Sequence, residues 1–227
     1  MSTFIRSAAF ALAAAFVAAP TFAQSAADGT QKLEAQGGSF SLSPYIGVVM
    51  PTADLLTLSR GTGTTTGAQN FKMSSAITVG GRLGVMFTSR VGVLADVGYS
   101  PGSVNLDSTG VTANTDVTTL SGVGKLVLYL IPSTSPVWLS VSGGGGAIRH
   151  SFHNGVGTLS GLTDGTNIGG VIGAGAGIRL GQLIALTGSV EDYLYDASFD
   201  NSGTKTSEKK QHDVRITGGI RIPILGM

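Results

Sequence analysis

The stretch ITVGGRLGVMF, residues 77–87, decides the fold because its residues alternate in character. The odd-numbered positions, such as Ile77 and Leu83, carry apolar residues or glycine. Most even-numbered positions are small, polar or charged, with Arg82 at the centre. A period of two is typical of a β-strand with two different faces. The stretch therefore predicts a strand with one apolar face and one small or polar face.

The same alternation recurs along the rest of the chain. The predicted strands cover residues 40–50, 77–87, 91–99, 120–130, 137–147, 168–180, 184–190 and 214–222. Short links are predicted near residues 88–90, 132–136 and 181–182, and long polar links at residues 52–75, 101–116, 150–167 and 196–211. Short turns that alternate with long loops are typical of a bacterial transmembrane barrel. The sequence therefore predicts an all-β protein, an eight-stranded antiparallel up-and-down transmembrane β-barrel.

The first residues are typical of a secretory signal peptide. Arg6 supplies the positive charge, an apolar, Ala-rich run covers residues 8–19, and Thr21 and Ala23 are the small residues that signal peptidase reads. We expect a signal peptide over 1–23, a flexible periplasmic lead-in over 24–38 and a barrel domain over 39–227. A membrane anchor is the alternative, but the apolar run is too short to span a bilayer comfortably.

Composition limits the alternatives. The chain has 35 glycines, no cysteine, 12% charged residues and a formal net charge of +1. Each glycine inside a helix costs about 1 kcal/mol relative to alanine, so helices are disfavoured. Without cysteine an exported protein cannot rely on disulfides, and a charge near zero favours no nucleic-acid partner. A transmembrane barrel or a low-complexity secreted array remains.

The charged residues at the strand centres indicate which face points inward. All of them share the glycine- and serine-rich face: Arg82, Asp96, Lys125, Arg179, Glu191, Arg215 and Arg221. In lipid, apolar residues face the acyl chains and charged residues fill the lumen, whereas a soluble, lipocalin-like binder would have the reverse arrangement. A soluble core needs large, closely packed residues, which the glycine-rich face lacks. We therefore favour the membrane interpretation, with these residues as a lumen network.

Two ion pairs are predicted inside the lumen. If residues 88–90 form a three-residue turn, Arg82 lies directly across from Asp96. Glu191 and Arg215, near the outer ends of the last two predicted strands, are expected to form the second pair. Eight strands leave an interior just wide enough for side chains, so these pairs are expected to plug the barrel. An ion or solute path through the lumen is the alternative.

His150, Ser151 and His153 form a candidate rim site, because outer-membrane lipid A deacylases are small barrels with a His and a Ser near the rim. Hydrolysis needs a nucleophile, a base and an orienting acid in mutual reach. The segment carries no nucleophile elbow, so a solvated loop with two incidental histidines is the simpler interpretation. We predict no catalytic residues, no cofactor and no metal site, since the histidine spacing is uninformative.

Several segments resemble the outer-membrane β-barrel superfamily that includes the OmpA, OmpX and OmpW types. They are Ser43-Pro44-Tyr45-Ile46-Gly47, Pro51-Thr52-Ala53-Asp54-Leu55, Glu191-Asp192-Tyr193 and Gly218-Gly219-Ile220-Arg221. The resemblance implies location in the cell outer membrane, contact with its lipids and lipopolysaccharide, and insertion by the barrel assembly machinery. Such barrels usually end on an aromatic residue, whereas this chain ends Ile222-Pro223-Ile224-Leu225-Gly226-Met227. A thin aromatic girdle is expected from Phe40, Phe87, Tyr99, Tyr129, Trp138 and Tyr193.

Four functions follow as hypotheses. The first is a structural or surface-interaction protein with a plugged lumen, which is expected to be a monomer without enzymatic activity. The second is a narrow channel for small apolar solutes, as the OmpW type implies. The third is a lipid-modifying enzyme at the rim, and the fourth is the soluble binder.

Overall fold

The computed structural model describes residues 39–52, 54–61, 66–107, 114–153, 163–181, 183–197, 200–201, 204–205 and 209–224. The predicted signal peptide and lead-in, residues 1–38, lie outside these ranges. Within them, no helix is long and apolar enough to cross a membrane.

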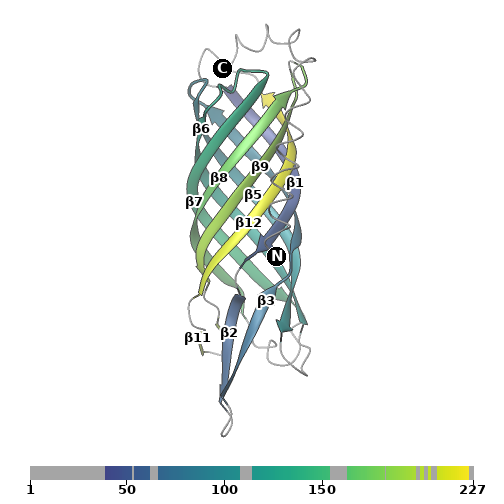
Figure 1. The fold of residues 1–227 in the computed structure, drawn as a ribbon, viewed down its shortest axis with the longest axis vertical. Helices are drawn as coiled ribbons and strands as arrows, with labels where there is room; N and C mark the ends of the chain where they lie inside the picture. Colours follow the sequence, from purple (N-terminus) through teal and green to yellow (C-terminus); the bar gives the residue numbers. More distant parts are fainter. Residues whose placement is uncertain are drawn as a thin grey trace.

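Eight strands form a closed, antiparallel barrel (Figure 1). They are β1 (Ser39–Pro51), β4 (Ala76–Met86), β5 (Val91–Asp107), β6 (Asn114–Tyr129), β7 (Val137–His153), β8 (Gly165–Arg179), β9 (Ala185–Ala197) and β12 (Lys209–Ile224). The barrel closes because β1 pairs with β4 on one edge and with β12 on the other. Closure gives each strand two hydrogen-bonded neighbours, as a structure surrounded by lipid requires. The predicted fold class is confirmed.

The link predicted over residues 52–75 is present between β1 and β4, but most of it is a hairpin rather than an open loop. The strands β2 (Asp54–Gly61) and β3 (Thr66–Met73) pair with each other, and β3 also pairs with β5. Strand β4 begins at Ala76, whereas its neighbour β5 continues to Asp107. The last part of β5 therefore has no β4 neighbour, and β3 pairs with it instead. The hairpin extends beyond one end of the barrel (Figure 1), whereas β10 (Asp200–Asn201) and β11 (Thr204–Lys205) form a much smaller hairpin.

Strand β5 continues past its predicted end at Tyr99 and includes Pro101. A proline has no backbone N–H and is expected to interrupt a strand that is paired on both sides. Pairing with β4 stops at Tyr99, whereas pairing with β6 continues to Asn105. The proline is therefore accommodated where β5 has left its β4 neighbour.

The apolar face of the strands points outward and the charged face points into the lumen, as the charge pattern predicted. Leu126 is 58% exposed on the outside, and its neighbour Lys125 is 3% exposed in the lumen. The same alternation leaves large apolar side chains on the outer surface, among them Leu42, Ile46, Ile77, Leu83, Val97, Ile172, Leu186 and Ile220. So much exposed apolar surface suits lipid and contradicts the soluble, lipocalin-like alternative.

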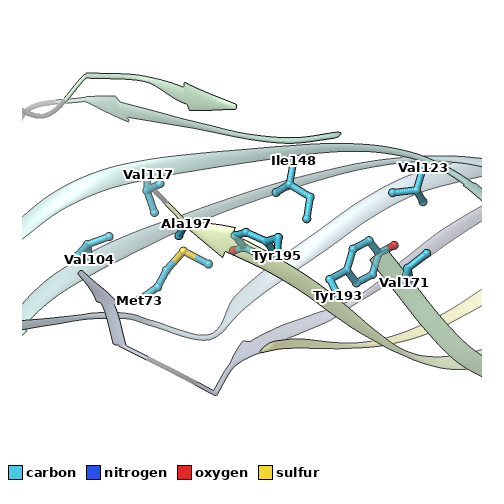
Figure 2. Packing of buried hydrophobic residues seen from close by; sticks show 9 residues of the cluster. All are labelled: Met73, Val104, Val117, Val123, Ile148, Val171, Tyr193, Tyr195 and Ala197. Carbon is cyan, nitrogen blue, oxygen red and sulfur yellow. The ribbon is translucent and has the colours of Figure 1, made fainter. Parts of the chain in front are cut away.

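Apolar clusters occupy both ends of the lumen. At the end with the short turns, Trp138 and Tyr129 pack with Met86, Val127 and Ala185. At the end with the long links, Figure 2 shows the larger cluster: Met73, Val104, Val117, Val123, Ile148, Val171, Tyr193, Tyr195 and Ala197. We call these the turn end and the loop end. Along β6, Lys125 lies between Val123 of the loop-end cluster and Val127 of the turn-end cluster.

The girdle prediction is wrong for three of its six residues. Tyr129, Trp138 and Tyr193 are only 6%, 3% and 2% exposed, because they share the lumen-facing side of their strands. Phe87 and Tyr99 are exposed on the outer surface.

Candidate functional site: an ionic plug in the lumen

Asp96 is the centre of the ionic plug, which we define as Arg82, Asp96, Lys125, Glu191 and Arg215. Its Oδ2 accepts hydrogen bonds from Arg82 Nε at 2.8 Å and from Lys125 Nζ at 2.7 Å. Its Oδ1 accepts one from the Tyr45 hydroxyl at 2.7 Å. Asp96 is 1% exposed, so these charge-assisted bonds are made away from bulk water. The predicted Arg82–Asp96 pair is present.

Glu191 joins the same cations from the opposite wall of the barrel. Its Oε1 accepts from Lys125 Nζ at 2.7 Å and lies 3.3 Å from Arg82 Nη2. Its Oε2 accepts from the Tyr193 hydroxyl at 3.1 Å. Lys125 therefore bridges the two carboxylates, and the bridge spans the lumen from β6 to β9.

The predicted Glu191–Arg215 pair is wrong. The two residues are register partners on β9 and β12, but their side chains contact different groups. Arg215 Nη2 donates to Ser121 Oγ at 2.7 Å, and its Nη1 lies 3.8 Å from Asp96 Oδ1. The reason is the narrow lumen, in which long side chains reach residues across the barrel as easily as those on the next strand.

Two tyrosines and two hydroxyl residues surround the plug, and none of them belongs to the lumen network predicted from the sequence. The guanidinium of Arg82 stacks over Tyr45 at 4.5 Å, and that of Arg215 over Tyr193 at 4.3 Å. Arg82 Nη2 also donates to hydroxyls on β9 and β12, those of Ser189 and Thr217, each at 3.0 Å. All four residues lie on the charged face of their strands, so the alternation alone could have identified them.

Glycine makes room for the plug. A Cβ on Gly98 would lie 2.8 Å from both Arg215 Nη1 and the Tyr45 hydroxyl. By contrast, a Cβ on Gly81, on the outer face, would have no heavy atom within 4 Å. The glycines of the inner face thus leave the space that the large plug side chains fill.

Arg179 and Arg221 do not join the plug as predicted. Both guanidinium groups lie against Trp138, at 5.9 and 5.8 Å from the ring centre. Arg179 Nη2 also donates to the Ser133 carbonyl at 2.6 Å. The backbone of each residue lies near the turn end of its strand, so the side chains do not reach the plug carboxylates.

The predicted rim residues His150 and Ser151 do not form a base–nucleophile pair. His150 is fully buried in the lumen, where its Nε2 lies 3.3 Å from the Tyr195 hydroxyl. Ser151 follows on the outer face and donates to Asp164 Oδ2 at 3.0 Å, while His153 is exposed at the end of β7. Adjacent residues of a strand point to opposite faces, so His150 cannot act as a base for Ser151. Across the described ranges, no group of three or more His, Asp or Glu residues is placed to hold a metal ion.

The space around the plug is small. On its loop side, a void of about 10 Å³ is lined by Asp213, Arg215 and Tyr193 and has room for about one water molecule. On its turn side, a cavity of about 70 Å³ lies between Arg82 and the turn-end residues Tyr129 and Trp138. The plug separates these two spaces.

The geometry defines a class: a transmembrane β-barrel of the outer-membrane type, with an apolar outer surface and a charged lumen. Similar solved structures include the outer membrane protein OprG from Pseudomonas aeruginosa, with TM-score 0.62 and 16% identity over 84% of this chain and 97% of that one. AlkL, determined in lipid bilayers, has TM-score 0.55 and 14% identity, covering 83% and 91%. Neisserial surface protein A has TM-score 0.51 and 10% identity, covering 81% and 96%. At such identities the likeness shows the fold alone.

No family model and no curated protein sequence matches the chain.

Proposed function

We propose that this protein is a closed, non-conducting barrel of the outer membrane with a structural or surface-interaction role. The observation that carries the proposal is the plug, in which Lys125 bridges Asp96 and Glu191 across the lumen at 2.7 Å each. Ions would have to break buried, charge-assisted bonds to pass. The role of such a barrel then lies at its ends and outer surface.

The proposal orients the turn end toward the periplasm and the loop end toward the medium, as in barrels with short periplasmic turns. The β2–β3 hairpin then extends outward from the cell surface. Arg149, with its side chain 57% exposed, and Lys210 lie on the outer face near the loop end. Cations there would suit the phosphate groups of lipopolysaccharide.

The remaining partners are part of the same proposal: membrane lipids around a monomer, and the barrel assembly machinery during insertion. We also propose that the protein has no enzymatic activity, supported by the opposite orientations of His150 and Ser151. The channel for small apolar solutes stays a prediction.

Planar-bilayer recordings test the plug. We expect the wild-type protein to show no sustained discrete openings, because its lumen is bridged by side chains. The charge-neutral double variant Lys125→Ala, Glu191→Ala removes the bridge and is expected to conduct more. Folding of both proteins is checked by heat-modified mobility in gels. Sustained wild-type openings of the same size as those of the double variant would reject the closed barrel.

A further inference from the structure

The cavity on the turn side of the plug is a chamber lined by both polar and apolar residues. Its volume of about 70 Å³ has room for about five water molecules. Arg82 and Glu191 line it at the plug, and Tyr129, Trp138 and Arg221 line it toward the turn end. The function proposed above assigns no role to this space.

Three buried donors of the chamber wall have capacity to bind a ligand. Arg82, Ser41 and Ser43 are 7%, 3% and 8% exposed, and all three line the cavity. Arg82 uses Nε and Nη2 for its bonds within the plug, whereas its Nη1 and the two serine hydroxyls donate to no other described residue. Buried polar groups of this kind are costly unless a polar ligand or water completes them.

The charge around the chamber is positive. Among the described residues, the lumen holds five cations, Arg82, Lys125, Arg179, Arg215 and Arg221, and three buried carboxylates, Asp96, Glu191 and Asp213. Glu191 lines the chamber, but its oxygens already accept hydrogen bonds from Lys125 and from the Tyr193 hydroxyl. The two arginines beside Trp138 add positive potential at the turn end, and narrow sites of one sign concentrate the opposite ion.

We propose that the chamber binds a small inorganic anion, of halide to phosphate size, that enters from the turn end. Arg82 Nη1 and the hydroxyls of Ser41 and Ser43 donate to the anion, and Arg221 supplies attraction from the other side. Guanidinium and hydroxyl groups are common anion donors. A cation would be repelled, and an organic anion much larger than phosphate would not fit the volume.

Tryptophan fluorescence tests the proposal directly, because Trp138 is the only tryptophan of the chain and lines the chamber. Iodide is the probe, caesium the cationic quencher and acrylamide the neutral one, all in sodium gluconate, whose anion is too large for the cavity. Each quenching constant is divided by that of the same quencher for free N-acetyltryptophanamide, because iodide and caesium differ in intrinsic efficiency. We expect the normalised iodide constant to exceed the normalised caesium constant by at least about threefold and iodide quenching to saturate. Chloride or phosphate should compete with iodide and leave acrylamide quenching unchanged.

Two arginine variants separate the chamber from surface charge. Arg221→Gln removes a cation of the chamber, whereas Arg90→Gln removes one from the exposed turn after β4, where Arg90 Nη1 donates to the Leu130 carbonyl at 3.1 Å. Only Arg221→Gln should bring the normalised iodide constant down to the normalised caesium value. Ser43→Ala keeps every charge and should weaken chloride competition, which preserves the test if Arg221→Gln does not fold. Equal normalised quenching by iodide and caesium in the wild type, or an equal loss in the two arginine variants, would overturn the proposal.

Discussion

Replacing Asp96 with asparagine is expected to lower the free energy of unfolding by about 3–5 kcal/mol. Asp96 accepts hydrogen bonds from Arg82 and Lys125 and lies 3.8 Å from Arg215. Asparagine keeps the shape but removes the charge that these three buried cations share. Its amide group would also present N–H donors to neighbours that are themselves donors. The cost is therefore that of uncompensated buried charge.

Urea unfolding in detergent micelles or bilayers measures this cost, with Asp164→Asn as the matched control. Asp164 also pairs with an arginine, Arg149, at 3.1 Å, but both side chains are about half exposed. The hydrogen bond from Arg149 lowers the pKa of Asp164, yet an exposed pair of this kind contributes less than about 1 kcal/mol. Similar losses for both variants would mean that the plug is not a buried network.

Placing arginine at Leu126 is expected to destabilise the barrel in a bilayer by about 2–4 kcal/mol. Leu126 is 58% exposed on the outer face, one residue from the plug residue Lys125. In a soluble barrel, a charge at so exposed a site would cost almost nothing. The penalty arises because the side chain faces acyl chains near mid-depth.

Leu183→Arg is the control for this substitution. Leu183 is 71% exposed in the short link before β9, at the end of the barrel. A charge near the interface costs about 0–1 kcal/mol. Urea titrations of both variants in lipid vesicles measure the difference, and a Leu126 variant as stable as the Leu183 variant would contradict the assigned lipid face.

Local alternation and one turn predicted much of this structure. The alternation around Arg82 predicted which face points inward, and the short turn predicted its partner. Phe87 N donates to the Val91 carbonyl at 2.9 Å, which sets the register that places Arg82 opposite Asp96. Both inferences needed only residues close in sequence.

Partners across the lumen could not be predicted in the same way. Glu191 and Arg215 are neighbours in register, but Glu191 contacts Lys125, three strands away around the wall. That choice depends on side-chain length and barrel diameter, not on sequence spacing. The same limit applies to Arg179 and Arg221, because the parity of a residue predicts its face of the strand but not its depth in the barrel.

Two further features follow strand geometry rather than residue type. Trp138 and Tyr193 were assigned to an aromatic girdle by residue type, although each shares the lumen-facing parity of its strand. The polar composition of residues 52–75 indicates a loop, whereas the long β5 offers an edge that β3 covers. Alternation along the strand places the two aromatic side chains in the lumen, and strand pairing places β3 beside β5.

Spin labelling along β6 tests the central claim, an inside-out barrel, most directly. The chain has no cysteine, so single cysteines can be placed at outward Leu120, Leu126 and Leu128 and at inward Val123 and Val127. In lipid vesicles, the outward labels should collide often with oxygen, which partitions into lipid, and rarely with a water-soluble nickel complex. The inward labels should be shielded from both. Outward labels that collide more often with nickel than with oxygen would contradict the account.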